Sequence, residues 1–506
     1  MKNAAYVMIF NLIAQLLGFV LNVLMAQNIG VSLEMDTFRL AQSYSFAVSV
    51  PVFAAIQVTF IPMYINIFSN YGEKEADKLY HQLSRVLIFV LGMIGLVFLG
   101  FTYISGQFLW PDSENAKQLF FFLSAILYVG QICYTYSVLN MAFLQAKEKF
   151  FVQSLSVVLT NLVPIAYFLF FYGKATNVIT VMMLLTLGYA LQWLLVRTYS
   201  QYFVTKKNEY GDLQLKNIIK DQKVREFVII AIPVLISNVV LKLSDLTEQN
   251  AAVLVGVGQL SILSFSYLLY TAILSLSVTP FITVIYPKLT TFINDKNKLE
   301  KDHYYNIIFV ILTILLPIMV GFLLFGQEVL NVLLAPRYSN SEIQMTYMLT
   351  SLYLVSIIFF GIREVTYRVC YTSGYQKIVM KNTLFAATVR IVGILIFGLL
   401  FQLPGIVLAL AFSIIISLLR LRTVTKKIIV GKLNFKKITG FTIEVLVLNI
   451  VATGGGLLVK FILIANNVNT FLAVIVSGIV FVAIYAISML LFRPKIYQNI
   501  LYYMSV

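Results

Sequence analysis

Two apolar segments of the chain carry polar side chains at the same helical spacing. The two sets are Asn11, Gln15, Gly18 and Asn22, and, about 227 positions later, Asn238, Lys242, Asp245 and Gln249. On a helix, steps of four, three and four residues place all four members of a set on one face. Hydrocarbon does not accommodate such a face, so each must look into protein or water. The duplication predicts a polar cavity between two related helix bundles, which is the layout of a transporter.

Cationic side chains inside the apolar segments could bind an anion. Lys242, Arg363 and Arg390 each lie well inside a predicted membrane span. An unpaired charge at that depth costs at least about 2.5–3.5 kcal/mol, so each is expected to have a partner or a ligand. Because guanidinium groups form bidentate contacts with phosphate, we predict that these residues bind a phosphate-bearing substrate.

Acidic and amide side chains complete the candidate site. Asp245, Glu248 and Glu364 either bind a coupling ion, a proton or sodium, or hold the fixed cations at rest. Five amides offer exchangeable hydrogen bonds to a head group with many hydroxyls: Asn11, Gln15, Asn22, Asn238 and Gln249.

Local spacing also predicts ion pairs among these charges. Lys242 and Asp245 are three residues apart, and Glu364 precedes Arg368 by four, so each pair can neutralise itself on one helix face. At the outer mouth of the second span, Asp36 and Arg39 contact substrate or pair with each other, unless Asp36 caps a helix.

Enzymatic chemistry is not indicated. The two histidines, His81 and His303, stand singly among charged residues in predicted loops, and no Gly-Lys-Ser/Thr phosphate loop occurs. Cys133 and Cys370 fall inside predicted spans, which argues against a disulfide or a metal site. We therefore predict a protein that is not an enzyme and uses no cofactor or metal. Energy would come from an ion gradient, the membrane potential or downstream consumption of the product.

The composition is that of a membrane protein with many spans. About 60% of residues are hydrophobic and 11% are charged, against roughly 45–50% and 25% in soluble domains. Apolar runs long enough to cross roughly 30 Å of hydrocarbon recur throughout, and the first is too long for a signal-peptide core. We predict an all-α protein with about fourteen transmembrane helices. These lie near 4–27, 38–69, 80–104, 117–144, 150–172, 177–203, 224–249, 259–287, 304–325, 343–372, 380–401, 404–422, 436–464 and 469–492.

The net charge of +16 is a topology signal rather than a sign of nucleic-acid binding. With the N-terminus inside, outer loops contain only Lys117, Lys174 and Arg337 among the basic residues, while the predicted inner segments are rich in them. This bias predicts that both termini are cytoplasmic. Anionic membrane lipids are the expected partners of the basic loops.

The chain divides into two similar halves. Leu40–Tyr44 parallels Leu263–Tyr267, Pro62 parallels Pro287, and the loop 145–149 parallels 373–377. Since six spans is an even number, the halves are parallel repeats. We predict halves at 1–204 and 224–423, joined by a cytoplasmic linker at 205–223. The linker is either an amphipathic helix on the inner leaflet or a solvated connection. Residues 424–506 would add a basic loop and two further helices.

This pattern resembles the oligosaccharidyl-lipid flippase branch of the multidrug/oligosaccharidyl-lipid/polysaccharide exporter superfamily. Met35-Asp36-Thr37-Phe38, followed by Phe60-Ile61-Pro62, is similar to a motif of MurJ-type lipid II flippases. The arginines that this type carries in its first two spans have no counterpart here, which leaves Wzx-like flippases of capsule or exopolysaccharide units as an alternative. By the resemblance, Asp36 matches the acidic position of the family.

The resemblance implies a flippase in a bacterial inner membrane. Its substrate would be an undecaprenyl-pyrophosphate-linked oligosaccharide, moved from the inner to the outer leaflet by alternating access, with a glycan polymerase as a candidate partner. The polyprenyl tail would stay in lipid, along a groove made by the last two spans. Two other functions stay open: an ion-coupled drug or metabolite antiporter of the same superfamily, and a membrane-embedded glycan polymerase or transferase.

Overall fold

The computed structural model describes residues 2–171, 177–204, 215–296, 299–335, 337–430, 434–496 and 498. Lys174 and the first ten residues of the predicted linker, 205–214, lie outside the described residues.

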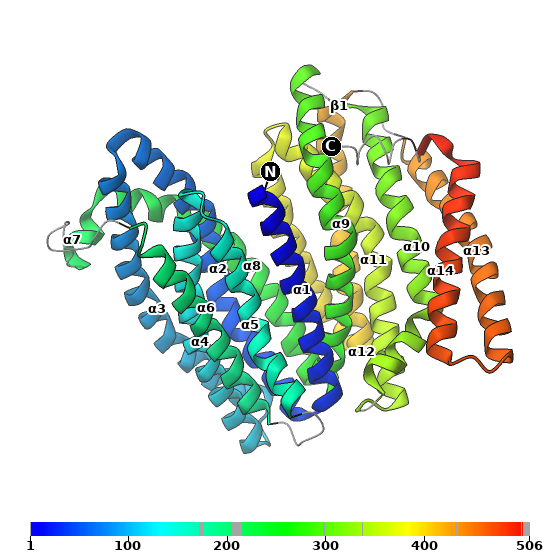
Figure 1. Cartoon of the computed structure of the whole chain (residues 1–506), viewed down its shortest axis with the longest axis horizontal. Helices are drawn as coiled ribbons and strands as arrows, with labels where there is room; N and C mark the ends of the chain where they lie inside the picture. Colours follow the sequence, from blue (N-terminus) through cyan, green and yellow to red (C-terminus); the bar gives the residue numbers. More distant parts are fainter. Residues whose placement is uncertain are drawn as a thin grey trace. The chain divides into compact units, whose positions relative to one another are not determined.

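The described chain is almost entirely helical (Figure 1). The helices are α1 (Lys2–Asn28), α2 (Leu33–Tyr71), α3 (Glu73–Leu109), α4 (Glu114–Ala146), α5 (Phe151–Phe170), α6 (Val178–Ser200), α7 (Leu215–Lys220), α8 (Gln222–Val255), α9 (Gln259–Lys296), α10 (Lys301–Leu334), α11 (Asn340–Thr372), α12 (Gln376–Ile428), α13 (Phe435–Ala465) and α14 (Thr470–Phe492). Among the described residues, thirteen helices are long and apolar enough to cross a membrane. This confirms the predicted all-α membrane fold.

The fourteenth crossing is contained in α12, which is a hairpin of two helices. Gln402 has a φ of 54° and a ψ of −133°, which breaks the helix just before Pro404. Asn382 Nδ2 donates to Ser417 Oγ at 2.7 Å, although a straight helix would separate residues 35 apart by about 50 Å. The chain therefore reverses at Gln402, where the sequence predicts the turn between its eleventh and twelfth spans.

The helices form two compact units, residues 1–261 and 262–506. Within the first unit, α8 packs along α2, although the sequence assigns this helix to the second repeat. The division of the chain into repeats at 205–223 stays a prediction. A compact unit is defined by contacts within it, whereas a repeat is defined by similarity between two segments.

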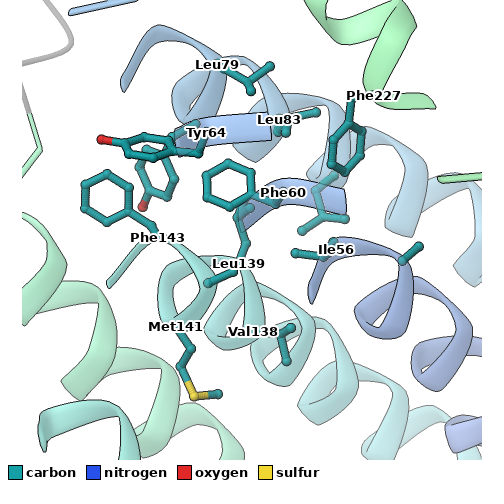
Figure 2. Close-up of a cluster of buried hydrophobic side chains, with 14 of the residues drawn as sticks. Ile56, Phe60, Tyr64, Leu79, Leu83, Val138, Leu139, Met141, Phe143 and Phe227 are labelled. Atoms are coloured by element: carbon teal, nitrogen blue, oxygen red, sulfur yellow. The ribbon is translucent and has the colours of Figure 1, made fainter. Parts of the chain in front are cut away.

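The first unit has a well-packed aromatic and aliphatic core near one end (Figure 2). Phe60 and Tyr64 of α2 pack against Phe143 of α4, and the rings of Tyr64 and Phe143 meet edge to face with centroids 5.5 Å apart. Leu83 of α3 and Phe227 of α8 border the same cluster. This core fixes the ends of α3, α4 and α8 around α2.

Local geometry supports the internal repeat. The loop after α4 and the loop after α11 each contain one residue with positive φ, Glu148 at 60° and Gly374 at 82°. The residue that follows donates its N–H five positions back in both loops, from Lys149 to Leu144 and from Tyr375 to Cys370, each at 2.8 Å. Such paired bonds terminate a helix with a left-handed residue.

A second repeated contact links the third and fourth helices of each repeat. Tyr80 of α3 donates to Asn140 of α4 at 2.6 Å, and Tyr304 of α10 bonds to Thr366 of α11 at 3.0 Å. The positions differ by 224 and 226, which matches the offset of the loops.

The last two spans extend the second unit beyond the repeat. Helices α13 and α14 pack on each other and on α10 (Figure 1). Their intramembrane charges are paired: Lys460 with Glu328, and Arg493 with Glu444. In the same unit, a short parallel pairing joins β1 (Leu299–Glu300) to β2 (Ile429–Val430).

The described part of the linker is tied to α3. Helix α7 buries Ile218, and Asp221 accepts a hydrogen bond from Gln82 at 2.8 Å. Lys223, at the start of α8, pairs with Glu75 at 2.7 Å. From Leu215 onward, the linker therefore packs against protein rather than extending into solvent.

Helix α5 approaches α6 so closely that Gly188 has no room for a side chain. A Cβ there would lie 2.9 Å from Thr160 O and 3.0 Å from Thr160 Cα. We expect Gly188→Ala to lower the free energy of unfolding by about 1–3 kcal/mol relative to Gly92→Ala, because the backbone of α5 must move. Gly92 has nothing within 4 Å of its Cβ position, and both changes gain the same helix propensity. Thermal unfolding in detergent measures the difference, and equal melting temperatures would contradict this packing.

Candidate functional site

The carboxylate of Asp36 caps the first turn of α9. Asp36 is 1% exposed and accepts hydrogen bonds from Gly258 N at 2.5 Å and Ser261 N at 2.7 Å. Ser261 Oγ donates a third bond at 2.5 Å. A negative charge at a helix N-terminus is stabilised by the unpaired N–H groups and the helix dipole. The cap that the sequence offers as one reading of Asp36 is therefore made to a helix 222 positions away.

Glycine permits this close approach of the α8–α9 connection. Gly258 has a φ of 80°, and its Cβ position lies against the side chain of Val31. A larger residue would hold the loop away from α2 and lengthen the Asp36 bonds. One turn further along α2, Arg39 Nη1 donates to Gln42 Oε1 at 3.4 Å.

The polar stripe of α1 is uncovered only in its first half. Asn11 and Gln15 are exposed, whereas Gly18 and Asn22 are half-buried. The neighbouring Ala14 is buried and accepts a hydrogen bond through its carbonyl from Asn161 of α5 at 3.1 Å. Asn22 turns back to bond Gly18 O at 2.7 Å. The predicted face is therefore available on α1, and its function as a cavity lining stays a prediction.

The stripe of α8 contains the predicted ion pair. Lys242 Nζ lies 2.8 Å from Asp245 Oδ2, and the two side chains are 29% and 31% exposed. Asn238 bonds its own helix at Val234 O, at 2.9 Å. Glu248 is buried on the side of α8 that faces its unit, and Gln249 is half-buried. The pair leaves Lys242 and Asp245 accessible while neutralising both charges.

A tyrosine links this region to α2. Tyr44 Oη donates to Asn250 Oδ1 at 3.1 Å, one residue beyond the stripe. Neither residue was predicted as part of the site. The signal was present in the sequence as a polar residue directly after Gln249, but only the packing of α8 on α2 identifies its partner.

In the second unit, charged groups of two helices lie within electrostatic range of one phenol. The phenol is Tyr270 of α9, which is hydrogen-bonded to Ser356, and the charged groups are Arg363 and Glu364 of α11 and Arg390 of α12. Arg363 lies 3.8 Å from Glu364, with its guanidinium 5.0 Å from the ring of Phe360. Tyr270 was not predicted, because nothing in its own segment distinguishes it from the other tyrosines of the chain.

Glu364 is shared by two arginines. Arg368 Nη2 lies 4.0 Å from Glu364 Oε2, as predicted from the i,i+4 spacing, and its guanidinium is 5.6 Å from the ring of Tyr286. With Arg390 nearby, one carboxylate serves several cations, so the cluster has excess positive charge. It can bind an anion with two acceptor groups.

An apolar groove lies between α10 and α14. Its volume is about 710 Å³, and its walls include Pro317 and Gly321 of α10 and Gly478 and Phe481 of α14. Tyr485 closes one side by donating to Thr313 O at 2.9 Å. The small residues let a chain-like apolar ligand approach the helix backbones. The tail path predicted along the last two spans, α13 and α14, stays a prediction; the groove shares α14 with it.

The structure thus joins the predicted residues into separate clusters. Lys242 and Asp245 form one, Arg363, Glu364 and Arg390 another, and Asp36 is engaged in a helix cap. In the described part of the chain, no group of three or more His, Cys, Asp or Glu side chains is arranged to hold a metal ion.

Comparison with known proteins gives one family. The family described as lipid II flippase MurJ matches residues 25–478 of the chain. Among curated proteins, no sequence relative matches this chain.

Solved structures share the fold. One described as lipid II flippase MurJ in an inward closed conformation has a TM-score of 0.78 and 18% identity, covering 97% of this chain and 99% of its own. An inward-facing multidrug resistance MATE family transporter of the MOP superfamily gives 0.68 and 13%, covering 82% and 95%. A MOP superfamily transporter from Pyrococcus furiosus, described as having a binding pocket of reversed polarity, gives 0.57 and 14%, covering 84% and 96%.

The hydrogen bonds of Asp36 to the start of α9 are expected to contribute to the free energy of unfolding. Asp36→Ala leaves Gly258 N, Ser261 N and Ser261 Oγ without an acceptor, so we expect a loss of at least about 1.5–3 kcal/mol in unfolding free energy. Glu34→Ala removes an exposed carboxylate from the same first turn of α2 and should cost only about 0.3–1 kcal/mol. Denaturation in detergent compares the two variants. A similar loss in both would show that the helix dipole of α2, rather than the cap on α9, is what Asp36 serves.

Proposed function

The chain belongs to the lipid II flippase MurJ family, and from this premise we propose how it moves a polyprenyl-pyrophosphate-linked glycan across the membrane. The family match spans residues 25–478 and therefore includes both compact units. The proposed activity makes and breaks no covalent bond. It needs a site for the pyrophosphate, a site for the sugars and a path for the tail.

The excess positive charge of the α11–α12 cluster carries the proposal. Arg363 and Arg390 bind the pyrophosphate, whose two phosphoryl groups can each accept a bidentate guanidinium contact. Tyr270, which is hydrogen-bonded to Ser356, lies within electrostatic range of both arginines. Glu364 balances part of the charge when no substrate is bound, which lowers the cost of holding these arginines at membrane depth.

The amide side chains of α1 and α8 are proposed to bind the glycan. Asn11 and Gln15 on α1 and Asn238 and Gln249 on α8 offer donors and acceptors that sugar hydroxyls can exchange with water, and Asn22 and Arg39 extend this polar surface. The Lys242–Asp245 pair is the candidate coupling site, with Glu248 as its neighbour. A coupling cation would bind Asp245 by displacing Lys242, which frees an ammonium group for the substrate anion.

The groove in the second unit is the proposed path of the polyprenyl tail. An undecaprenyl chain is apolar and flexible, and the groove between α10 and α14 offers an apolar wall at the edge of that unit. The tail then stays in hydrocarbon while the polar head group crosses through the protein. This arrangement avoids the cost of moving the chain through water.

The proposed orientation of the protein in the membrane is based on the placement of its basic residues. Basic residues concentrate in the loops that share a side with the N-terminus, which favours cytoplasmic termini in a bacterial inner membrane. Anionic lipids would contact these loops. A glycan polymerase that consumes the flipped unit would be the functional partner.

An ion-coupled antiporter is the second candidate, since MATE transporters share the fold. The arginines around Glu364 argue against it, because a cationic drug would be repelled by a site in which cations outnumber the acid. A glycan polymerase or transferase function has weaker support, because it would require a cluster of catalytic residues in the outer loops.

Charge removal tests the pyrophosphate site. In vesicles reconstituted with the purified protein, Arg363→Gln and Arg390→Gln should each reduce flipping of a polyprenyl-pyrophosphate glycan by at least about tenfold, since one charged hydrogen bond contributes about 1.5–3 kcal/mol. Arg337→Gln removes an exposed arginine from the loop after α10 and is the matched control. Wild-type flipping rates in both cluster variants would eliminate the pyrophosphate assignment.

Complementation separates the two glycan classes. Because the family is that of lipid II flippases, we expect the gene to restore growth in a strain depleted of its lipid II flippase, and the Arg363→Gln gene to fail at equal expression. Rescue of exopolysaccharide export in a strain without its repeat-unit flippase, with no rescue of growth, would instead assign the chain to polysaccharide units.

A further inference from the structure

A cavity in the first unit with several polar side chains in its lining is not used by the proposed flipping pathway. It has a volume of about 380 Å³ and lies among α3, α4 and α6. Six of its lining residues can donate hydrogen bonds or carry positive charge: His81, Ser84, Arg85, Tyr136, Trp193 and Arg197. None of the described residues that line the cavity carries a carboxylate, so its chemistry suits an anion.

Two of the donors are buried without a partner. In the part of the chain that the structure describes, neither Ser84 Oγ nor Trp193 Nε1 has a hydrogen-bond partner, although both atoms are shielded from solvent. Burying such a donor is costly unless a ligand or solvent accepts from it. Both groups line the cavity beside the guanidinium groups of Arg85 and Arg197.

Neighbouring contacts hold the basic groups in place. Arg197 Nη1 donates to Tyr80 Oη at 2.9 Å, and Tyr80 in turn bonds Asn140 at 2.6 Å. Tyr136 donates to Ser84 O across the α3–α4 contact. Arg197 is therefore oriented by a network between helices instead of extending from the surface at random.

The cavity opens where the protein surface becomes apolar. Ile88, which lines it, is 60% exposed, and Phe89 and Leu194 beside it are each 51% exposed. Arg85 directly precedes the long apolar run of α3 that begins at Val86. A charged group in the cavity would thus lie at head-group level, with acyl chains running along exposed apolar side chains.

The second unit contains a useful internal comparison. Tyr80 corresponds to Tyr304 by its bond to the neighbouring helix, so Ser84 and Arg85 correspond to Ile308 and Phe309. There the surface is apolar and covered by α13: Phe309 stacks on Phe441 with centroids 4.2 Å apart. The first unit has basic groups at the positions where its counterpart has a protein contact.

We propose that the cavity between α3, α4 and α6 binds the phosphate head group of an anionic phospholipid from the surrounding leaflet. Arg85 and Arg197 contact the phosphate, while Ser84 and Trp193 donate to its oxygens or to the glycerol backbone. A lipid, rather than a soluble phosphate, is favoured because the opening faces apolar surface. The site is independent of the flipping activity.

The two tryptophans of the chain allow a direct test. Trp193 lines the cavity, and Trp110 caps the far end of α3. In a Trp110→Phe variant, all tryptophan emission comes from Trp193. The full-length variant is reconstituted in bilayers containing brominated phosphatidylglycerol or brominated phosphatidylcholine, both of which quench nearby tryptophan. At equal mole fractions, we expect the relative binding constant for phosphatidylglycerol to be about fivefold to tenfold higher.

Further variants of the Trp110→Phe protein distinguish lipid binding in this cavity from a general attraction of anionic lipid to the positively charged protein. Arg85→Gln, alone and with Arg197→Gln, should reduce the preference to within about twofold and leave quenching by phosphatidylcholine unchanged, which also reports correct folding. Lys377→Gln with Lys381→Gln removes two exposed cations from the second unit and should keep the full preference. The single Arg85→Gln variant remains informative if the double variant does not fold.

Three results would overturn the proposal. Equal quenching by the two lipids would show that the cavity does not select an anion. A preference that survives Arg85→Gln would show that it arises elsewhere on the protein. Loss of the preference in sodium phosphate, but not in sodium chloride of equal ionic strength, would show that the ligand is a soluble phosphate instead of a lipid.

Discussion

Every charged group at membrane depth in this protein must be given a partner, because hydrocarbon solvates ions poorly. The structure meets this requirement in different ways. Lys242 pairs within its own helix turn, Lys460 pairs with a neighbouring helix, and Asp36 is surrounded by N–H and O–H donors. Around Glu364, two arginines share one carboxylate. This surplus of cations is what supports the proposal that the region binds an anionic substrate.

The two repeats share their helix-ending loops and their tyrosine contacts, but they differ in what covers them. In the second unit, the face of α10 that includes Phe309 is covered by α13. In the first unit, the corresponding position of α3 is Arg85, which lines a cavity. A duplicated scaffold can therefore acquire different surfaces without changing its helix packing. The charge asymmetry between the α1 and α8 stripes is another case of the same divergence.

Much of the fold could be predicted from the sequence, because the length of an apolar segment and the positions of its charged residues involve only residues close together in the chain. The spans, the reversal near Gln402 and the Glu364–Arg368 spacing all depend on residues close together in the chain. The partners of Asp36 and the position of Tyr270 depend on contacts between residues far apart in the sequence, which no local pattern encodes. The groove between α10 and α14 could not be predicted from the sequence either, since its two walls are far apart in the chain.

The two arms of α12 lie against each other where Gly393 faces Ala409, close enough that an added methyl group would be 3.1 Å from Ala409 Cβ. Such contact leaves no layer of lipid between the arms, and α11 packs along the hairpin. Arg363 and Arg390 are thus carried by helices that pack directly on each other. In the proposed transport cycle, release of the pyrophosphate would therefore depend on hydration of the site or on Glu364 replacing the ligand at the arginines, and not on separation of α11 from α12.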